Sequence, residues 1–210
     1  MKKIAFFVCL LAVCAAAARA QESRQDFSLS GSALIEPYKA SSTDIQVHST
    51  TAYGGLASYR FMLTPTSALE ASYGLTYENK ITYYGSNFQQ GAGPGIRVLT
   101  RTQDISGAYV RSFVFKNFNP FVEAGPAAII LMPILNSGTT DQDVHRQTEV
   151  GAMYVAGFAY EVSPSFDVRV EYRALVTKVP TFGLGSTNYN LTTNEWWNMS
   201  EPLVGIAYHF

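Results

Sequence analysis

Charged side chains recur at every second position in segments of the chain that are otherwise apolar. In residues 166–173, four apolar side chains share one face of an extended strand and four charged side chains share the other. The same parity places six charged residues on the polar faces of their strands: Glu70, Glu123, Arg169, Glu171, Arg173 and Glu201. Inside a narrow barrel these charges must pair, because removing one partner costs a few kcal/mol. We interpret the six as a structural ion-pair network; a gated narrow path for protons or ions is the alternative.

One polar segment has the residue types of a metal site. Residues 141–145 place the carboxylates of Asp141 and Asp143 and the imidazole of His145 on one side of an extended chain. Three such ligands can hold a divalent ion. Polar loops often contain runs of this kind, so we interpret the segment as a solvated loop. We expect neither a metal nor a cofactor.

Two polar segments bring serine and histidine close together in the sequence. His48 is near Ser49 and Asp44, and His145 is near Ser137. A hydrolytic triad needs side chains of these types. The nucleophile motif Gly-x-Ser-x-Gly is absent from the sequence, however. We expect no enzymatic activity, and a hydrolase of lipids or peptides is kept as an alternative.

The alternating charged side chains must lie on elements whose side chains repeat every two residues, as those of a β-strand do. Alternation recurs in segments of about ten residues, which is the length of a tilted strand that crosses a membrane. Convincing helical periodicity is absent from the sequence. The pattern predicts eight strands, at about residues 27–36, 50–62, 68–78, 100–114, 120–131, 149–162, 166–175 and 195–210. Ten strands result if the region around residues 82–84 or 187–189 forms an extra hairpin.

Short and long connections alternate between the predicted strands. Three are tight turns rich in residues that set turn dihedrals, at residues 64–67, 116–119 and 163–165. Four are long and polar, at about residues 36–49, 79–99, 133–148 and 176–194. Both ends of the mature chain therefore lie on the short-turn, periplasmic side. The predicted fold is all-β: an eight-stranded antiparallel up-and-down transmembrane β-barrel.

The first twenty residues have the pattern of a cleavable export signal. Lys2 and Lys3 precede an apolar run, and Ala18-Arg19-Ala20 has the small side chains that a signal peptidase accepts. The run is shorter than the roughly 20 residues that a membrane-spanning helix needs. We predict a signal peptide at residues 1–20 and one barrel domain at residues 21–210. Both cysteines lie in the signal, so no thiol chemistry is expected in the mature chain.

Charge and composition exclude further classes of protein. Without Lys2, Lys3 and Arg19, the mature chain has 12 basic and 16 acidic residues, a net charge of −4, so no nucleic-acid partner is expected. The chain is 47% hydrophobic with a mean hydropathy of +0.03, which suits a barrel that is apolar outside and polar inside. A secreted soluble lipocalin-like barrel, with its apolar faces turned inward, is the alternative.

Three stretches carry a resemblance to a known family. They are residues 119–125 (Asn-Pro-Phe-Val-Glu-Ala-Gly), residues 160–173, and the final residues 205–210. On these stretches the chain resembles the small OmpA/OmpX-like bacterial outer-membrane β-barrel domain family along most of its mature length. The resemblance implies a protein of the cell outer membrane of a Gram-negative bacterium. The sequence ends at Phe210, so we expect no periplasmic peptidoglycan-binding domain.

The last strand looks like the assembly signal of that family. Gly205, Tyr208 and Phe210 stand where the resemblance expects them, whereas Leu203 departs from the pattern, which has a polar residue there. The resemblance implies that this strand is read by the barrel-assembly machinery. The other expected partners are outer-membrane lipid and lipopolysaccharide, and an unidentified ligand at the cell surface.

The sequence therefore favours a non-enzymatic integral outer-membrane protein. The barrel would anchor a monomer, and four long extracellular loops would carry a structural or surface-interaction role, because loops on a rigid scaffold commonly carry recognition. A narrow porin-like channel, an outer-membrane hydrolase and a secreted soluble barrel remain the alternatives.

Overall fold

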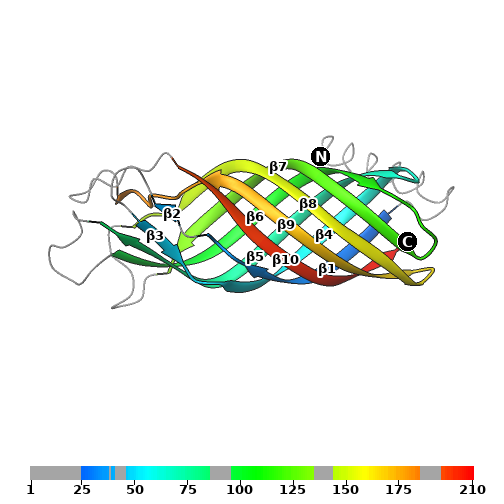
Figure 1. Ribbon diagram of the computed structural model, residues 1–210, viewed down its shortest axis with the longest axis horizontal. Helices are drawn as coiled ribbons and strands as arrows, with labels where there is room; N and C mark the ends of the chain where they lie inside the picture. Colours follow the sequence, from blue (N-terminus) through cyan, green and yellow to red (C-terminus); the bar gives the residue numbers. More distant parts are fainter. Residues whose placement is uncertain (1–24, 38, 41–45, 86–95, 135–143, 185–194) are drawn as a thin grey trace, which may run out of the picture.

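The computed structural model of the protein describes residues 25–37, 39–40, 46–85, 96–134, 144–184 and 195–210 (Figure 1). No helix among these residues is long and apolar enough to cross a membrane. The strands, in chain order, are β1 (Gln25–Leu34), β2 (Lys39–Ala40), β3 (Gln46–Ser49), β4 (Ala52–Thr64), β5 (Ser67–Tyr84), β6 (Ile96–Ser112), β7 (Phe118–Pro133), β8 (Gln147–Ser163), β9 (Phe166–Lys178) and β10 (Trp196–His209).

Eight long strands close into an antiparallel barrel. Each pairs with its neighbour in the chain order β1, β4, β5, β6, β7, β8, β9 and β10, and the pairing of β1 with β10 completes the ring. The strands run obliquely around the barrel, and the short turns gather at the same end as the C-terminus (Figure 1). This short-turn end and the opposite long-loop end are the two mouths of the barrel. The eight-stranded barrel predicted from the sequence is confirmed.

Side chains alternate between the interior and the outer surface, as the period-two pattern requires. In β1, the buried residues Asp26, Ser28 and Ser30 alternate with the exposed residues Phe27 and Leu29. The other barrel strands likewise place large apolar side chains outward, while their inward side chains include polar and small ones as well as large apolar ones such as Leu131 and Trp197. An outer surface of this composition suits lipid, whereas a soluble barrel would bury these faces.

The strands at the long-loop end extend further than the sequence pattern indicates. β5 continues to Tyr84, and β6 begins at Ile96, so much of the predicted loop 79–99 is strand. A bulge between Thr76 and Asn79, where Glu78 has a φ of 56°, shifts the alternation by one residue. Asn79, Ile81 and Tyr83 then continue the inward face. The single-residue shift breaks the period that the prediction depends on.

The predicted first loop, residues 36–49, contains a short hairpin. β2 pairs with β3, and β3 pairs with the extended part of β5, so that His48 lies opposite Thr82. Residues 82–84 thus belong to β5 and form no separate barrel hairpin, while residues 187–189 lie outside the described residues. The predicted turn at 116–119 is shorter than expected, because β7 already begins at Phe118.

Candidate functional site

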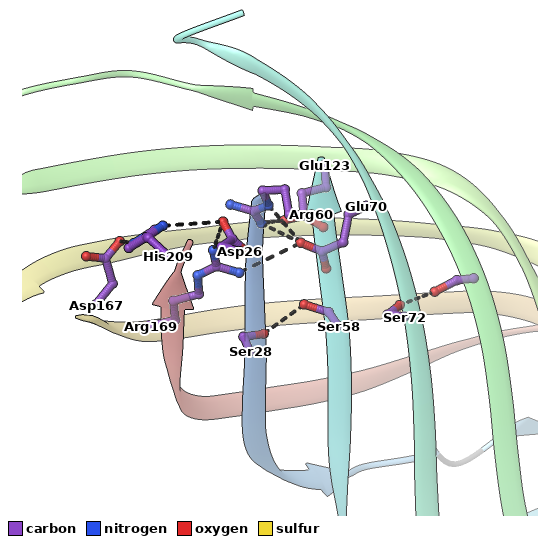
Figure 2. Close-up of polar contacts among 11 residues, drawn as sticks. Asp26, Ser28, Ser58, Arg60, Glu70, Ser72, Glu123, Asp167, Arg169 and His209 are labelled. Atoms are coloured by element: carbon purple, nitrogen blue, oxygen red, sulfur yellow. Dashed lines mark hydrogen bonds and ion pairs between the residues drawn. The ribbon is translucent and has the colours of Figure 1, made fainter. Parts of the chain in front are cut away.

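The lumen at the short-turn end contains an ion cluster, which we name the first ion cluster: Asp26, Arg60, Glu70, Glu123 and Arg169 (Figure 2). The Arg60 guanidinium lies 2.7 Å from Glu70 Oε2 and also pairs with Glu123 across the lumen. Arg169 Nη2 lies 2.6 Å from Asp26 Oδ2, and its Nη1 lies 3.8 Å from Glu70 Oε2. The carboxylate of Glu70 thus links two arginines from different strands, Arg60 of β4 and Arg169 of β9, so the cluster connects distant parts of the barrel wall through the lumen.

His209 extends this arrangement toward the short-turn mouth. Its Nε2 lies 2.9 Å from Asp167 Oδ2, and its Nδ1 lies 4.0 Å from Asp26 Oδ2 (Figure 2). A cavity of about 110 Å³ lies beside these groups, and its lining includes Arg60, Arg169 and Asn119. Asp26 Oδ1 is buried with no hydrogen-bond partner among the described residues, as is Arg169 Nε. The cavity therefore has the size and polarity to hold a few water molecules.

A second ion cluster lies further along the lumen. It joins Arg173 of β9 to Asp104 of β6 and Glu201 of β10. Arg173 Nη1 donates to Glu201 Oε2 at 2.8 Å, and its Nη2 donates to Ser106 Oγ at 2.9 Å. One arginine thus ties together strands from opposite walls, which fixes the lumen in a closed arrangement.

Hydroxyl groups lie between the two ion clusters. Ser28 and Ser58 are hydrogen-bonded at 2.7 Å, and Ser72 and Ser106 at 2.5 Å. These small side chains leave room for the guanidinium groups in a lumen only wide enough for side chains. Together, the serines and the ion clusters fill a part of the lumen that would contain water in a wider pore.

All six residues of the predicted ion network are buried. Their exposed fractions lie between 1% and 7%, and they are Glu70, Glu123, Arg169, Glu171, Arg173 and Glu201. The structure divides five of them between the two clusters instead of joining all six in one network. Glu171 lies on β9 between Arg169 and Arg173 and makes no ion pair within 4 Å among the residues that the structure describes.

Five further residues of the lumen are absent from the predicted network: Asp26, Arg60, Asp104, Asp167 and His209. Parity alone reveals most of them, because Arg60 alternates with Tyr59 and Phe61 on a clear strand. Asp26 was missed because the predicted strand begins one residue later, at residue 27. The pairing partners follow only from the register of neighbouring strands and from closure of the barrel, which brings Arg60 to Glu123 across the lumen.

Apolar side chains close the lumen at the long-loop end. Val179, Phe182 and Leu184 follow β9 and are fully or almost fully buried. Among the contacts that hold this segment in place, Tyr83 Oη donates to the carbonyl of Pro180 at 2.7 Å, and Gln147 Oε1 accepts from the backbone nitrogen of Phe182 at 2.6 Å. The buried core includes many apolar lumen residues, such as Val47, Ile81, Val98, Leu131 and Trp197.

Glu36 is a buried acid at this same end. It is 5% exposed, and its carboxyl lies near Ser49 and Asn79, which are themselves joined by a 2.6 Å hydrogen bond. Burial raises the pKa of Glu36 to about 7, although the polar side chains of the neighbouring Ser49 and Asn79 oppose that effect. The acid lies just after β1, near Ser49 of β3 and Asn79 of β5, so a change in its charge acts on the closed long-loop mouth.

The three residues of the predicted assembly signal lie on or just after β10. Gly205 is packed closely against β1: a Cβ there would lie 2.3 Å from the carbonyl oxygen of Leu29. Tyr208 and Phe210 point outward, and the ring of Tyr208 lies 5.1 Å from that of Phe166. The structure thus places two aromatic rings at the outer surface beside the seam between β1 and β10.

The residues considered for catalysis and metal binding do not come together as a described site. The ring of His48 packs edge-on against Tyr84 at 5.3 Å, and Ser49 donates to Asn79. The backbone nitrogen of His145 donates to the carbonyl of Phe182. Their remaining predicted partners lie outside the described residues: Asp44, Ser137, Asp141 and Asp143. The described part of the chain holds no group of three or more Asp, Glu, His or Cys that could bind a metal.

Solved structures share this fold at low sequence identity. Crystal structures of Neisserial surface protein A (15% identity, TM-score 0.54) and of OprG from Pseudomonas aeruginosa (12%, TM-score 0.64) match 88% and 90% of this chain and 97% of each of theirs. The attachment invasion locus protein Ail of Yersinia pestis, solved with the heparin analogue sucrose octasulfate, matches 89% of this chain and 99% of its own (12% identity, TM-score 0.50).

No curated protein matches the chain significantly. The profile of the outer membrane protein beta-barrel domain family matches residues 6–210. This match agrees with the closed barrel, its apolar outer surface and its polar lumen, and it identifies the cell outer membrane as the location. The chain therefore belongs to the outer membrane protein beta-barrel domain family.

Proposed function

We propose that this protein is a closed membrane anchor that presents a contact surface outside the cell. The observation that carries this proposal is the filled lumen. Two ion clusters and a serine layer fill one part, and buried apolar side chains fill the part at the long-loop end. A water-filled pore needs a wider barrel than eight strands provide. The barrel is therefore better suited to holding an outer surface in place than to conducting solutes.

The long-loop end supports the second half of the proposal. β3, β5 and β6 form an extended sheet beyond the main barrel, in which His48, Thr82 and Arg97 lie side by side in register. His48 and Arg97 are both exposed. Short turns lie at the periplasmic end of such barrels and longer loops at the cell surface, so this sheet projects from the cell. It is the rigid part of the proposed contact surface.

Two measurements test the proposal. Reconstituted into planar bilayers, the wild-type protein is expected to show no discrete conductance steps. In cells, replacing residues 39–49 by a short Asn-Gly turn is expected to abolish adhesion to a matrix-coated surface while the barrel still shows heat-modifiable mobility on gels. Conductance steps in the wild-type protein would support the narrow channel instead. Unchanged adhesion of cells carrying a folded variant would rule out this sheet as the contact surface.

A further inference from the structure

An apolar groove interrupts the outer surface of the barrel across β1, β4 and β5. Its volume is about 340 Å³, and its lining is Leu29, Ser30, Gly54, Gly55, Leu56, Ala57, Tyr73, Leu75 and Tyr77. The small residues Gly55 and Ala57 form its floor between taller side chains on the neighbouring strands. Along the outward row of β4, the exposed residues Tyr53 and Tyr59 lie on either side of this floor. The groove therefore lies within the membrane-facing surface.

The barrel itself does not require a glycine at position 55. Its backbone has an ordinary negative φ, and among the described residues a Cβ there would have one contact, at 3.4 Å from the carbonyl oxygen of Ser30. Gly54 differs, because a Cβ there would lie 2.1 Å from the carbonyl oxygen of Leu75. Glycine within a strand costs about 0.5–1 kcal/mol relative to alanine. A glycine that the barrel does not need indicates close approach of another molecule from outside.

Basic side chains lie beside this groove on its long-loop side. Arg101 Cζ lies 4.4 Å above the ring centroid of Tyr77, which lines the groove. Arg101 Nε is buried and has no hydrogen-bond partner among the residues described here. Lys80, opposite Leu99, and Arg97, opposite Thr82, continue the same outer face of β5 and β6. Glu78 is the one acid beside them in this part of the two strands.

We propose that this groove and these cations form a binding site for lipid A, the phosphorylated anchor of lipopolysaccharide. One acyl chain lies in the groove over Gly55, and a phosphate lies on Arg101, Arg97 and Lys80. The long-loop end faces outward, so the site opens to the outer leaflet. The apolar floor of the groove lies deeper in the membrane than the cations at its long-loop side, which is the arrangement that a lipid with apolar chains and an anionic head requires. The site shares Arg97 with the proposed contact surface, whereas its groove over Gly55 lies on the part of the barrel that faces lipid.

A lipid chain suits the groove better than a second copy of the barrel does. The floor is a narrow depression, whereas the outer surfaces around it are convex and carry protruding rings such as Tyr53, which is 72% exposed. A stable protein interface buries roughly 1,200–2,000 Å² over complementary surfaces. A second barrel also offers no reason for the cations at one end of the groove. A phosphorylated lipid accounts for both the narrow apolar groove and the cations at one end of it.

Native mass spectrometry of the folded mature protein in detergent, with added lipid A, tests this site. Gly55→Leu fills the groove, and we expect it to weaken lipid A binding about tenfold. The double variant Arg97→Gln/Arg101→Gln removes two head-group contacts and is expected to weaken binding by about the same factor. Phosphatidylcholine, which has no net charge, is expected to bind weakly to the wild type and to be insensitive to the arginine changes.

Matched controls come from the same sheet. Gly107→Leu adds the same side chain at another outward glycine where a Cβ has no contact closer than 4.0 Å. Arg111→Gln removes an exposed arginine at the short-turn end of β6. Both are expected to bind lipid A like the wild type, and heat-modifiable mobility checks the folding of each variant.

Three results would overturn the proposal. The first is equal loss in Gly55→Leu and Gly107→Leu, or no loss in either. The second is equal binding of lipid A and phosphatidylglycerol, which would make the site one for anionic phospholipid in general. The third is a dimer that Gly55→Leu dissociates, since the groove would then belong to a second copy of the chain.

Discussion

Asp26 and His209 lie directly opposite each other across the seam where β1 meets β10, and His209 Nδ1 is 4.0 Å from Asp26 Oδ2. Asp26 also receives the guanidinium of Arg169 at 2.6 Å, while His209 reaches Asp167 on β9. The last strand is thus joined by side chains to both of its neighbours at the short-turn end. The two strands that close the barrel, β1 and β10, are therefore held together by interactions between ionisable side chains as well as by backbone hydrogen bonds.

Asp26→Asn is expected to destabilise the barrel, because it leaves Arg169 buried with a weakened partner. Loss of one partner of a buried pair costs about 3–5 kcal/mol. Asp167→Asn is the control: its partner His209 is more accessible, and we expect a loss of about 1 kcal/mol or less. Urea-unfolding midpoints in lipid vesicles measure both. Equal midpoints for the two variants would mean that the Asp26–Arg169 pair does not brace the seam.

The second ion cluster is suited to a test by single and triple substitution. Arg173→Met leaves Asp104 and Glu201 in the lumen without their cationic partner, and the expected loss of folding free energy is about 3–5 kcal/mol. The triple variant Arg173→Met/Asp104→Leu/Glu201→Leu removes every charge of the cluster, so most of that loss should be recovered. Free energies of unfolding check this. A triple variant less stable than Arg173→Met would show that the ion pairs themselves supply net stability.

Gly205→Ala is expected to impair barrel closure. The added Cβ would lie 2.1 Å from Ser30 Oγ and 2.3 Å from the carbonyl oxygen of Leu29, so β1 and β10 must separate. Gly31→Ala, on the other side of the same seam, brings a Cβ only to 4.0 Å from the carbonyl oxygen of Val204. The fraction of heat-modifiable protein in the membrane should fall for the first variant and stay unchanged for the second. Equal fractions would contradict the predicted clash.

The long-loop closure is expected to weaken as the pH rises, because burial raises the pKa of Glu36 from 4.5 to about 7. A raised carboxyl pKa means that the folded state favours the neutral acid. Its stabilising contribution is complete below about pH 4.5 and is lost as the pH rises through about 7. Amide exchange of β3 should therefore be slower at pH 5 than at pH 8 after correction for intrinsic rates. Glu36→Gln should abolish this difference, and a persisting difference would exclude Glu36 as its source.

Most of the barrel was predictable because one physical pattern, alternation of side chains across a strand, recurs along the chain. The segment from Phe166 to Arg173 shows it plainly, and the structure has the predicted strand there. The pattern failed where it is interrupted: the bulge at Glu78 shifts the parity, so the remaining part of β5 was assigned to a loop. The β2–β3 hairpin is too short for the pattern to reveal it.

The sequence by itself determined which side chains face inward, since parity assigns Arg169, Glu171 and Arg173 to one face regardless of the neighbouring strand. Only the tertiary structure decided their partners, because closure of the barrel brings Arg173 of β9 across the lumen to Asp104 of β6, 69 residues away in the sequence. Strand pairing likewise created the groove beside Gly55, which β1, β4 and β5 line, and placed beside it cations from β5 and β6. Alternation is a local property of the backbone, whereas pairing and concave surfaces depend on how distant strands meet.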